Sequence, residues 1–326
     1  MITTVITLLS LVGYVIISPF LVLCDDRDDA QTFYEAVFSR VMRRITSSDP
    51  EFLRGLYGFY GNLQSLIYRP SKIVETPTVK GVWYEAIVEN AIAEVTVYYV
   101  HGGGFVCGSA TTQSWDLIKP LTDAFNAKKI STRVFSLEYD LTPQHQYPHQ
   151  RNQTLEGYKW LLAQKAQNMI LMGDSAGGNM VTVLLQTLVR ENLPMPLGAI
   201  LISPWVDISV TARSYTYNNK TDVFDGSTIT SWRDLYATDK DYQEASPLFH
   251  SLEGLPPLMV VYGGKELMTD DVTEFVSRAK KAKVDVKVIC HPRMVHNYPV
   301  FFRYSGAAAE AYYEMGKFAW SLISNC

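Results

Sequence analysis

Hydrophobic positions along most of the chain fall into two alternating kinds of run. Short runs of consecutive apolar residues, rich in β-branched side chains, predict buried strands at residues 95–100, 132–138, 168–172, 199–202, 258–262 and 285–290. Longer runs, whose apolar residues recur at helical spacing, predict helices at residues 116–128, 153–166, 176–190, 271–282 and 306–323. Strands that alternate with helices in this way are typical of βαβ units, so we expect an α/β fold with a mostly parallel sheet.

Two segments depart from this alternation. Residues 30–68 have amphipathic helical spacing, and the turn residues Ser48, Asp49 and Pro50 divide them into two expected helices. Residues 209–242 are polar, aromatic and rich in turn residues, which indicates an insertion over the sheet. We therefore predict a helical N-terminal or cap region over residues 25–78, followed by an α/β domain over residues 79–326 that contains this insertion.

The N-terminal segment, residues 2–24, contains no charged side chain. About 20 apolar residues are enough for a helix to cross a bilayer, so residues 1–24 predict a transmembrane signal-anchor. A signal peptide cleaved near Cys24, which would give a secreted protein, and a buried helix remain alternatives. The acidic cluster at residues 25–29 differs from the basic flank typical of the cytoplasmic side. It therefore favours a membrane of the endoplasmic reticulum or another secretory compartment, with the remaining chain in the lumen, and glycosylation sequons at Asn152 and Asn219 agree with that compartment.

Composition narrows the functional classes. The 326 residues are 47% hydrophobic and 19% charged, which is enough apolar material for a large core. The formal net charge is -4, so no basic surface for nucleic acid is expected. The four cysteines, Cys24, Cys107, Cys290 and Cys326, have no spacing typical of a metal site. A disulfide among the last three and free thiols both remain open.

The strongest chemical motif is G-x-S-x-G at residues 173–177, directly after one predicted strand and directly before a predicted helix. This is the setting of a nucleophile elbow, a sharp turn that projects a serine hydroxyl above the sheet. Ser175 is therefore the candidate nucleophile, and Asp174 supports the motif. The N–H of Ala176 lies at the start of the helix, where the dipole favours negative charge. A glycine-rich turn and a phosphate-binding loop are the alternatives for this motif alone.

A second motif, HGGGF, follows the strand at residues 95–100. Consecutive glycines let the main chain approach a substrate closely and present N–H groups to an oxyanion. We expect an oxyanion hole formed by the N–H groups of Gly103, Gly104 and Ala176. His101 and Gly102 are expected to support the loop structurally. A flexible turn is the alternative.

A serine nucleophile requires a base and an acid, which in this order of elements follow it along the chain. His296, after the last predicted strand, is the preferred base, and His291 is its rival. The acid is expected on the loop 263–271, where Glu266 is preferred and Asp270 is the alternative. The histidines that precede this loop are expected to be surface or packing residues; they are His145, His149 and His250.

The pair HGGGF and GDSAGG resembles the hormone-sensitive-lipase-like branch of the α/β-hydrolases, which includes arylacetamide deacetylases and fungal steryl acetyl hydrolases. Further segments agree with the resemblance, namely residues 139–143, 147–148, 203–207, 245–248 and 255–257, so that it covers roughly residues 80–320. It implies an eight-stranded, mostly parallel sheet flanked by helices, with a helical cap. In this branch the acid loop usually carries aspartate where this chain has Glu266, which leaves the identity of the acid open.

Together the motifs predict a serine esterase or deacetylase that acts on a hydrophobic acyl ester through an acyl-enzyme on Ser175, with no metal or cofactor. An acetylated sterol or lipid is the expected substrate class. Membrane contact is expected through the N-terminal segment, and no protein partner is predicted. An amidase with the same residues and a catalytically silent ligand-binding protein are the alternatives. Aromatic residues of the insertion are expected either to line the pocket or to pack the cap; they are Tyr215, Tyr217, Phe224, Trp232 and Tyr236.

Overall fold

The computed structural model describes Ser18 and residues 32–324. The predicted signal-anchor therefore lies outside the described residues, apart from Ser18, and so does the acidic cluster that follows it. Within the described part of the chain, no helix combines the length and the apolar character needed to cross a membrane. Membrane attachment stays a prediction.

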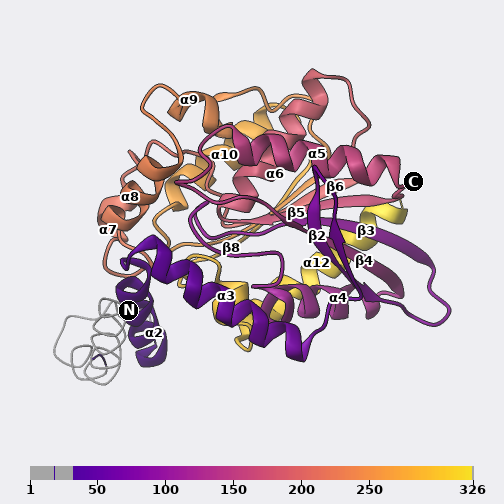
Figure 1. The fold of residues 1–326 in the computed structure, drawn as a ribbon, viewed down its shortest axis with the longest axis horizontal. Coiled ribbons are helices and arrows are strands. Elements are labelled where there is room, and N and C mark those ends of the chain that lie inside the picture. Colours follow the sequence, from indigo (N-terminus) through magenta and orange to yellow (C-terminus); the bar gives the residue numbers. More distant parts are fainter. Residues whose placement is uncertain (1–17, 19–31, 325–326) are drawn as a thin grey trace.

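The core of the fold is one eight-stranded sheet, which confirms the predicted α/β-hydrolase architecture (Figure 1). The spatial order is β1-β2-β4-β3-β5-β6-β7-β8, with β1 and β2 antiparallel to their neighbours and all later pairs parallel. The strands are β1 (Lys72–Glu75), β2 (Lys80–Ala86), β3 (Ala93–Val100), β4 (Ile130–Glu138), β5 (Met169–Asp174), β6 (Gly198–Ile202), β7 (Leu258–Gly263) and β8 (Val286–His291).

The first two strands were not predicted from the hydrophobic pattern. β1 is four residues long and buries only Val74. β2 pairs with β1 on one side and with distant β4 on the other, where Lys80 lies opposite Glu138 and Ala86 opposite Thr132. β1 is too short for a clear pattern, and the place of β2 in the sheet depends on a partner elsewhere in the chain, so the local sequence of each carries little signal.

Helices cover both faces of the sheet. They are α2 (Phe33–Thr46), α3 (Pro50–Ile67), the π-helical turn η1 (Ser114–Ile118), α4 (Lys119–Asn126), α5 (His149–Ala163), α6 (Ala176–Arg190), α7 (Ser214–Tyr217), α8 (Gly226–Tyr236), α9 (Tyr242–Ala245), the 3₁₀ turn η2 (Pro247–Phe249), α10 (Thr269–Lys281), α11 (Tyr298–Phe301) and α12 (Gly306–Ser324). Helix α5 packs on α6, and α4 packs on α12.

The break between α2 and α3 falls at the turn residues that the sequence indicated. Helix α2 begins with a capping box, in which Thr32 and Glu35 each accept the other's backbone N–H. Helix α3 begins at Pro50, and the side chain of Asp49 accepts the backbone N–H of Glu51 at 2.8 Å. The N-terminus of each helix is thus specified by residues next to it in the sequence.

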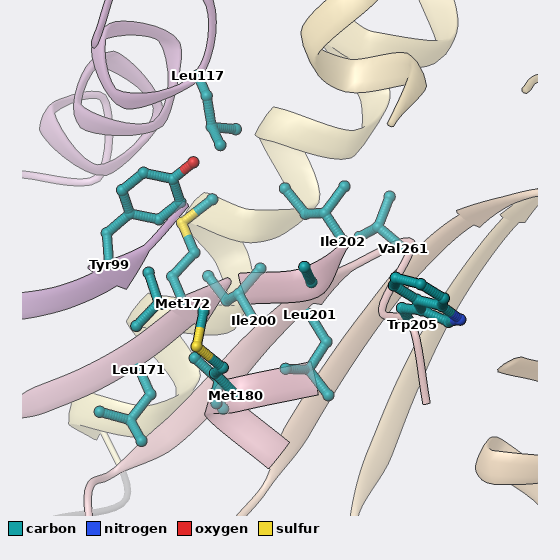
Figure 2. Packing of buried hydrophobic residues seen from close by; sticks show 14 of the residues in the cluster. Tyr99, Leu117, Leu171, Met172, Met180, Ile200, Leu201, Ile202, Trp205 and Val261 are labelled. Carbon is teal, nitrogen blue, oxygen red and sulfur yellow. The ribbon is translucent and has the colours of Figure 1, made fainter. Parts of the chain in front are cut away.

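The hydrophobic core is built around the central strands and includes α6. Every residue of β5, β6 and β7 is buried, and so is α6 from Ala176 to Leu188. Figure 2 shows this packing, with Met172 and Ile200 from neighbouring strands and Met180 from α6. Burial on both sides explains why these strands appear as continuous apolar runs rather than as an alternating pattern.

The N-terminal helices and the insertion meet over one edge of the sheet. Helices α7 and α8 lie at the same end of the molecule as α2 (Figure 1). The guanidinium of Arg43 on α2 donates a hydrogen bond to the backbone carbonyl of Asp222 in the insertion. The chain leaves β3, β5, β7 and β8 at this edge, because parallel strands place their carboxyl ends on the same side.

The structure shows the state of two of the cysteines and the exposure of both sequon asparagines. Cys107 is buried and Cys290 is exposed, and both are free thiols, so they are not joined to each other. Cys326 lies outside the described residues. Asn152 and Asn219 are exposed, and their glycosylation stays a prediction.

Candidate active site

Ser175 occupies a strained turn between β5 and α6. Its backbone has φ 53° and ψ -119°, a conformation that non-glycine residues rarely adopt. The N–H of Ser175 donates to the carbonyl of Ile202 at 2.9 Å, and the Ser175 carbonyl accepts the N–H of Trp205 at 3.0 Å. The turn is therefore held from both sides by the segment at the end of β6. Ser175 is 5% exposed and lines a cavity of about 250 Å³.

The HGGGF loop reaches the same cavity. Gly103 lines it together with Ser175, and the φ values of Gly103 and Gly104 are 114° and 60°. A Cβ atom on Gly103 would collide with the carbonyl of Cys107, and one on Gly104 would collide with the ring of Trp232. The two positions thus require glycine both for backbone conformation and for space.

His101 lies beneath this loop rather than in the cavity. Its ring is buried and stacks on Tyr139, with the centroids 4.1 Å apart. Its Nδ1 lies 2.7 Å from the carbonyl oxygen of Gly102, and the hydroxyl of Tyr139 donates to the His101 carbonyl at 2.9 Å. Burial lowers the pKa of His101 to about 4, so the ring is neutral at physiological pH. These contacts hold the loop in place.

Asp174 joins three segments of the site. Its buried carboxylate accepts hydrogen bonds from Gly102 N–H at 2.9 Å and the Tyr99 hydroxyl at 2.7 Å. It also accepts from the side-chain amides of Gln113 at 3.1 Å and Asn297 at 2.7 Å. Burial raises the pKa of Asp174, whereas these donors favour its charged form. The carboxylate next to the nucleophile therefore fixes both the HGGGF loop and the segment after His296.

His296 and Glu266 face each other in the buried interior. The Nδ1 atom of His296 lies 3.6 Å from the Oε2 atom of Glu266, and both side chains are almost completely buried. The same Oε2 atom accepts the Ser203 hydroxyl at 2.6 Å and, more weakly, the N–H of Gly263 at 3.4 Å. Burial lowers the pKa of His296 to about 3 and raises that of Glu266. The imidazole is thus neutral, which is the form able to accept a proton.

The two rival residues lie in other surroundings. The carboxylate of Asp270 accepts the Ser214 backbone N–H at 3.0 Å and the Tyr217 hydroxyl at 2.6 Å, so it is directed toward the insertion. His291 ends β8, and its ring lies 6.1 Å from that of Tyr298. Of the candidate acids, Glu266 is the one that the structure brings beside His296.

Asp222, which the sequence did not single out, holds the acid and base loops together. Its buried carboxylate accepts the backbone N–H groups of His296 at 2.9 Å, Leu267 at 2.7 Å and Val223 at 2.8 Å. Burial raises its pKa to about 6, and its charge contributes to the raised pKa of Glu266. In the sequence it is one polar residue within a polar insertion, so no local signal marks it.

Ser203 and Asn297 are two further residues that the sequence reasoning missed as site residues. Both have left-handed backbone, with φ 42° and 51° respectively. The N–H of Asn297 donates to the Ser203 hydroxyl oxygen at 3.0 Å, and that hydroxyl in turn donates to Glu266. The non-glycine positive φ values were not predictable from composition, although Ser203 begins one of the segments that support the family resemblance.

Half of the residues that line the cavity at Ser175 are aromatic, and an apolar groove adjoins it. Tyr34, Phe38, Tyr57 and Tyr60 line it from the N-terminal helices, opposite Phe224, Trp232 and others from the rest of the chain. A groove of about 290 Å³ shares four of the lining residues and is walled by Phe38, Met42, Ile45, Leu56, Tyr57, Tyr60 and Phe301. The two hollows are therefore adjacent.

The aromatic residues of the insertion divide between the two roles that the sequence left open. Phe224 and Trp232 line the cavity. Tyr236 instead stacks on Phe105 with the ring centroids 3.6 Å apart, and Tyr215 is buried. The exposed Tyr217 donates to Asp270. The insertion both packs against the sheet and contributes to the pocket.

Comparisons with known proteins agree with this arrangement. The family described as having the alpha/beta hydrolase fold matches residues 97–300. An esterase of Acinetobacter venetianus is 33% identical over 262 residues, which are 76% of this chain and 84% of the relative. Arylacetamide deacetylase of Oryctolagus cuniculus is 24% identical over 161 residues, or 46% of this chain and 39% of the relative. The solved structure of an esterase from the bacterial hormone-sensitive lipase family superposes with a TM-score of 0.77 at 28% identity, covering 90% of this chain and 99% of that one.

Proposed function

The chain belongs to the hormone-sensitive-lipase-like branch of the α/β-hydrolase family and is an ester hydrolase, and from this premise we propose that it cleaves hydrophobic carboxylic esters through an acyl-enzyme on Ser175. The observation that carries the proposal is the strained Ser175 turn at the cavity wall, combined with a neutral His296 whose Nδ1 lies 3.6 Å from Glu266. Strain stored at a buried serine in a cavity is typical of a nucleophile.

The catalytic groups of the proposed reaction all belong to the chain, and water is the second reactant. His296 accepts the proton of the Ser175 hydroxyl as the oxygen attacks the ester carbonyl. The N–H groups of Gly103, Gly104 and Ala176 stabilise the tetrahedral oxyanion. His296 then protonates the leaving alcohol, and the acyl group remains on Ser175. In the second half of the reaction, His296 accepts a proton from a water molecule that attacks the acyl carbonyl. It returns that proton to the Ser175 oxygen as the carboxylic acid leaves.

Glu266 acts in this mechanism by stabilising the imidazolium that forms on His296. It must carry a negative charge to do so, and its burial opposes that charge. The hydroxyl of Ser203 and the N–H of Gly263 both donate to its Oε2 atom and favour ionisation. At a position where aspartate is usual in this branch, the glutamate side chain accepts a hydrogen bond from Ser203 and lies 3.6 Å from His296 Nδ1, a distance that must shorten for a hydrogen bond.

The lining of the site supports a hydrophobic substrate. Half of the residues that line the cavity are aromatic, and the adjoining groove is almost entirely apolar, as expected for an acyl chain or a flat apolar alcohol. The name of the arylacetamide deacetylase relative supports an acetyl group as the acyl part. The apolar groove supports a sterol or another lipid as the alcohol part, and such an acetyl ester is the class that we prefer. The second candidate substrate is an arylacetamide, which would be cleaved by the same residues and which the name of the same relative supports.

The proposed site of action is a membrane of the secretory pathway, with residues 1–24 as the anchor and the enzyme domain in the lumen. In the sequence, eight residues separate the uncharged segment 2–24 from α2, which begins at Phe33. Beyond Arg54, helix α3 carries no charged residue, and it exposes Phe59, Leu63, Leu66 and Ile67. An exposed apolar helix face next to the pocket suits a substrate that partitions into lipid.

The test is hydrolysis of p-nitrophenyl esters from acetate to palmitate, with p-nitroacetanilide as the amide, by the full chain in detergent and by Ser175→Ala. We expect ester turnover that Ser175→Ala reduces by at least about 10³-fold. Faster cleavage of the anilide than of the acetate would favour the amidase. If the folded wild-type protein turned over none of these compounds but bound them, the silent binding protein would replace the proposal.

A further inference from the structure

Three metal-ligating side chains converge on the segment that joins β4 to α5. Within the described residues, Asp140, His145 and His149 form the one group of three or more His, Cys, Asp or Glu whose ligand atoms all lie within 4.8 Å of one another. The Oδ2 atom of Asp140 lies 2.9 Å from the Nε2 atom of His149 and 3.9 Å from that of His145. None of these residues has a role in the proposed ester hydrolysis.

These separations suit a small transition-metal ion. A tetrahedral Zn²⁺ ion bound at about 2.0–2.1 Å keeps neighbouring ligand atoms about 3.3 Å apart. The two distances from Asp140 lie on either side of that value. Two imidazole nitrogens and one carboxylate oxygen form a donor set that Zn²⁺ and its neighbours prefer over Mg²⁺ or Ca²⁺.

The side chains can adjust to close around an ion. They are between 40% and 46% exposed, so water can supply a fourth ligand. The two imidazole rings are stacked, with their centroids 4.4 Å apart and their planes inclined by 24°. Coordination requires the rings to rotate from this stack, which their partial exposure to solvent permits.

The carboxylate is already held in position. Gln153 on α5 donates its amide N–H to Asp140 Oδ2 at 3.0 Å, and its amide oxygen accepts the backbone N–H of Asp140 at 2.9 Å. Hydrogen-bond partners of this kind orient the side chain that binds a metal ion. His149 is the first residue of α5, so its backbone is fixed by the helix.

We propose that Asp140, His145 and His149 bind one divalent transition-metal ion of the Zn²⁺ class. The ion links the two ends of the segment 139–149. This segment contacts the oxyanion loop through Tyr139, whose hydroxyl donates to His101, and through Thr142, whose N–H donates to Phe105 at 2.9 Å. It contacts the insertion through the N–H of Tyr147, which donates to Tyr236 at 2.8 Å. Metal binding therefore stabilises the contacts that this segment makes with the HGGGF loop and with the insertion.

The experiment is titration calorimetry of the full chain, without an affinity tag, with ZnCl₂, accompanied by the absorption spectrum of the Co²⁺ form and by thermal unfolding. We expect one ion per chain and the visible d–d bands typical of four-coordinate Co²⁺. The unfolding midpoint should be higher with Zn²⁺, because an ion that binds only the folded state stabilises that state. His145→Gln, His149→Gln and Asp140→Asn should each weaken binding at least about tenfold, because the loss of even a residue that only orients a ligand typically costs about 10–100-fold in affinity.

Two matched controls address other metal ligands. His250 is exposed and isolated from this group, and Cys290 is an exposed thiol beside His291. His250→Gln and Cys290→Ser should bind Zn²⁺ as the wild type does. The proposal is overturned if the wild type binds no ion, if the double variant His145→Gln/His149→Gln retains wild-type affinity, or if Cys290→Ser abolishes binding. None of these readouts depends on ester turnover.

Discussion

The carboxylate of Asp222 accepts the backbone N–H of His296 at 2.9 Å and, with its other oxygen, the backbone N–H of Leu267 at 2.7 Å. One residue of the insertion therefore fixes the loop of the proposed base and the loop of the proposed acid. Its own backbone carbonyl is held by Arg43 of α2. The position of His296 thus depends on the cap as well as on the sheet.

Replacing Asp222 by alanine should lower kcat more than it raises KM. A displacement of about 1 Å in a catalytic group can cost about 10²-fold in rate, and this substitution releases both loops. The matched control is Asp225→Ala in the same insertion, which removes the N-cap of α8 but no bond to either loop. That variant should lose about 1 kcal/mol of stability with kcat unchanged. Equal kcat in wild type and Asp222→Ala would contradict the positioning role.

Glu266 and Asp270 can be distinguished by paired amide substitutions. Glu266→Gln removes the charge 3.6 Å from His296 and should lower kcat by about 10²–10⁴-fold, since the imidazolium loses its counter-charge. Asp270→Asn should retain activity, because that carboxylate bonds to Ser214 and Tyr217. Steady-state kinetics on p-nitrophenyl acetate decides between them. A large loss in Asp270→Asn alone would reverse the assignment.

The apolar groove beside the cavity should set the chain-length preference. Met42→Trp places a larger ring in the groove and should lower kcat/KM for decanoate at least about tenfold, while acetate changes less than about twofold, because each excluded methylene is worth about 1 kcal/mol or more. Leu56→Trp on the opposite helix should act in the same direction. Ile87→Trp, an exposed position outside both hollows, is the control. A uniform loss on all esters would show that the groove does not bind the acyl chain.

A buried acidic pair under the insertion should make stability depend on pH. Burial first, and the nearby Asp207 second, raise the pKa of Asp271 to about 8. The folded protein therefore keeps a proton on Asp271 between about pH 4, the pKa in the unfolded chain, and about pH 8. Because the unfolded state has released that proton, the contribution of Asp271 to stability falls as the pH rises through this window.

Asp271→Asn removes this dependence. Its unfolding midpoint should exceed that of the wild type at pH 9, by about 2–4 °C for each kcal/mol relieved, and the difference should shrink toward pH 5. Thermal unfolding at several pH values measures this, with Asp285→Asn at an exposed position as the control. A difference between Asp271→Asn and wild type that grows toward acid pH would have the opposite sign and would contradict the raised pKa.

The sequence predicted what is encoded locally. The buried runs of β5, β6 and β7 and the full length of α6 are contiguous, and the Ser175 turn lies within one short motif. The positioning residues could not be predicted, because their roles depend on contacts between distant segments. Asp222 is 74 residues from His296, and Ser203 is 63 residues from Glu266. The choice between Glu266 and Asp270 likewise required side-chain directions, which spacing along a loop does not provide.

The central claim is that Ser175 forms the covalent intermediate. The direct test is to treat the wild-type protein with a fluorophosphonate and to locate the adduct by mass spectrometry of its peptides, alongside the Ser175→Ala variant. The account predicts one phosphonate per chain, attached to Ser175, with ester turnover lost in proportion to labelling and no adduct in Ser175→Ala. An adduct on another residue, or full turnover by a protein labelled at Ser175, would contradict it.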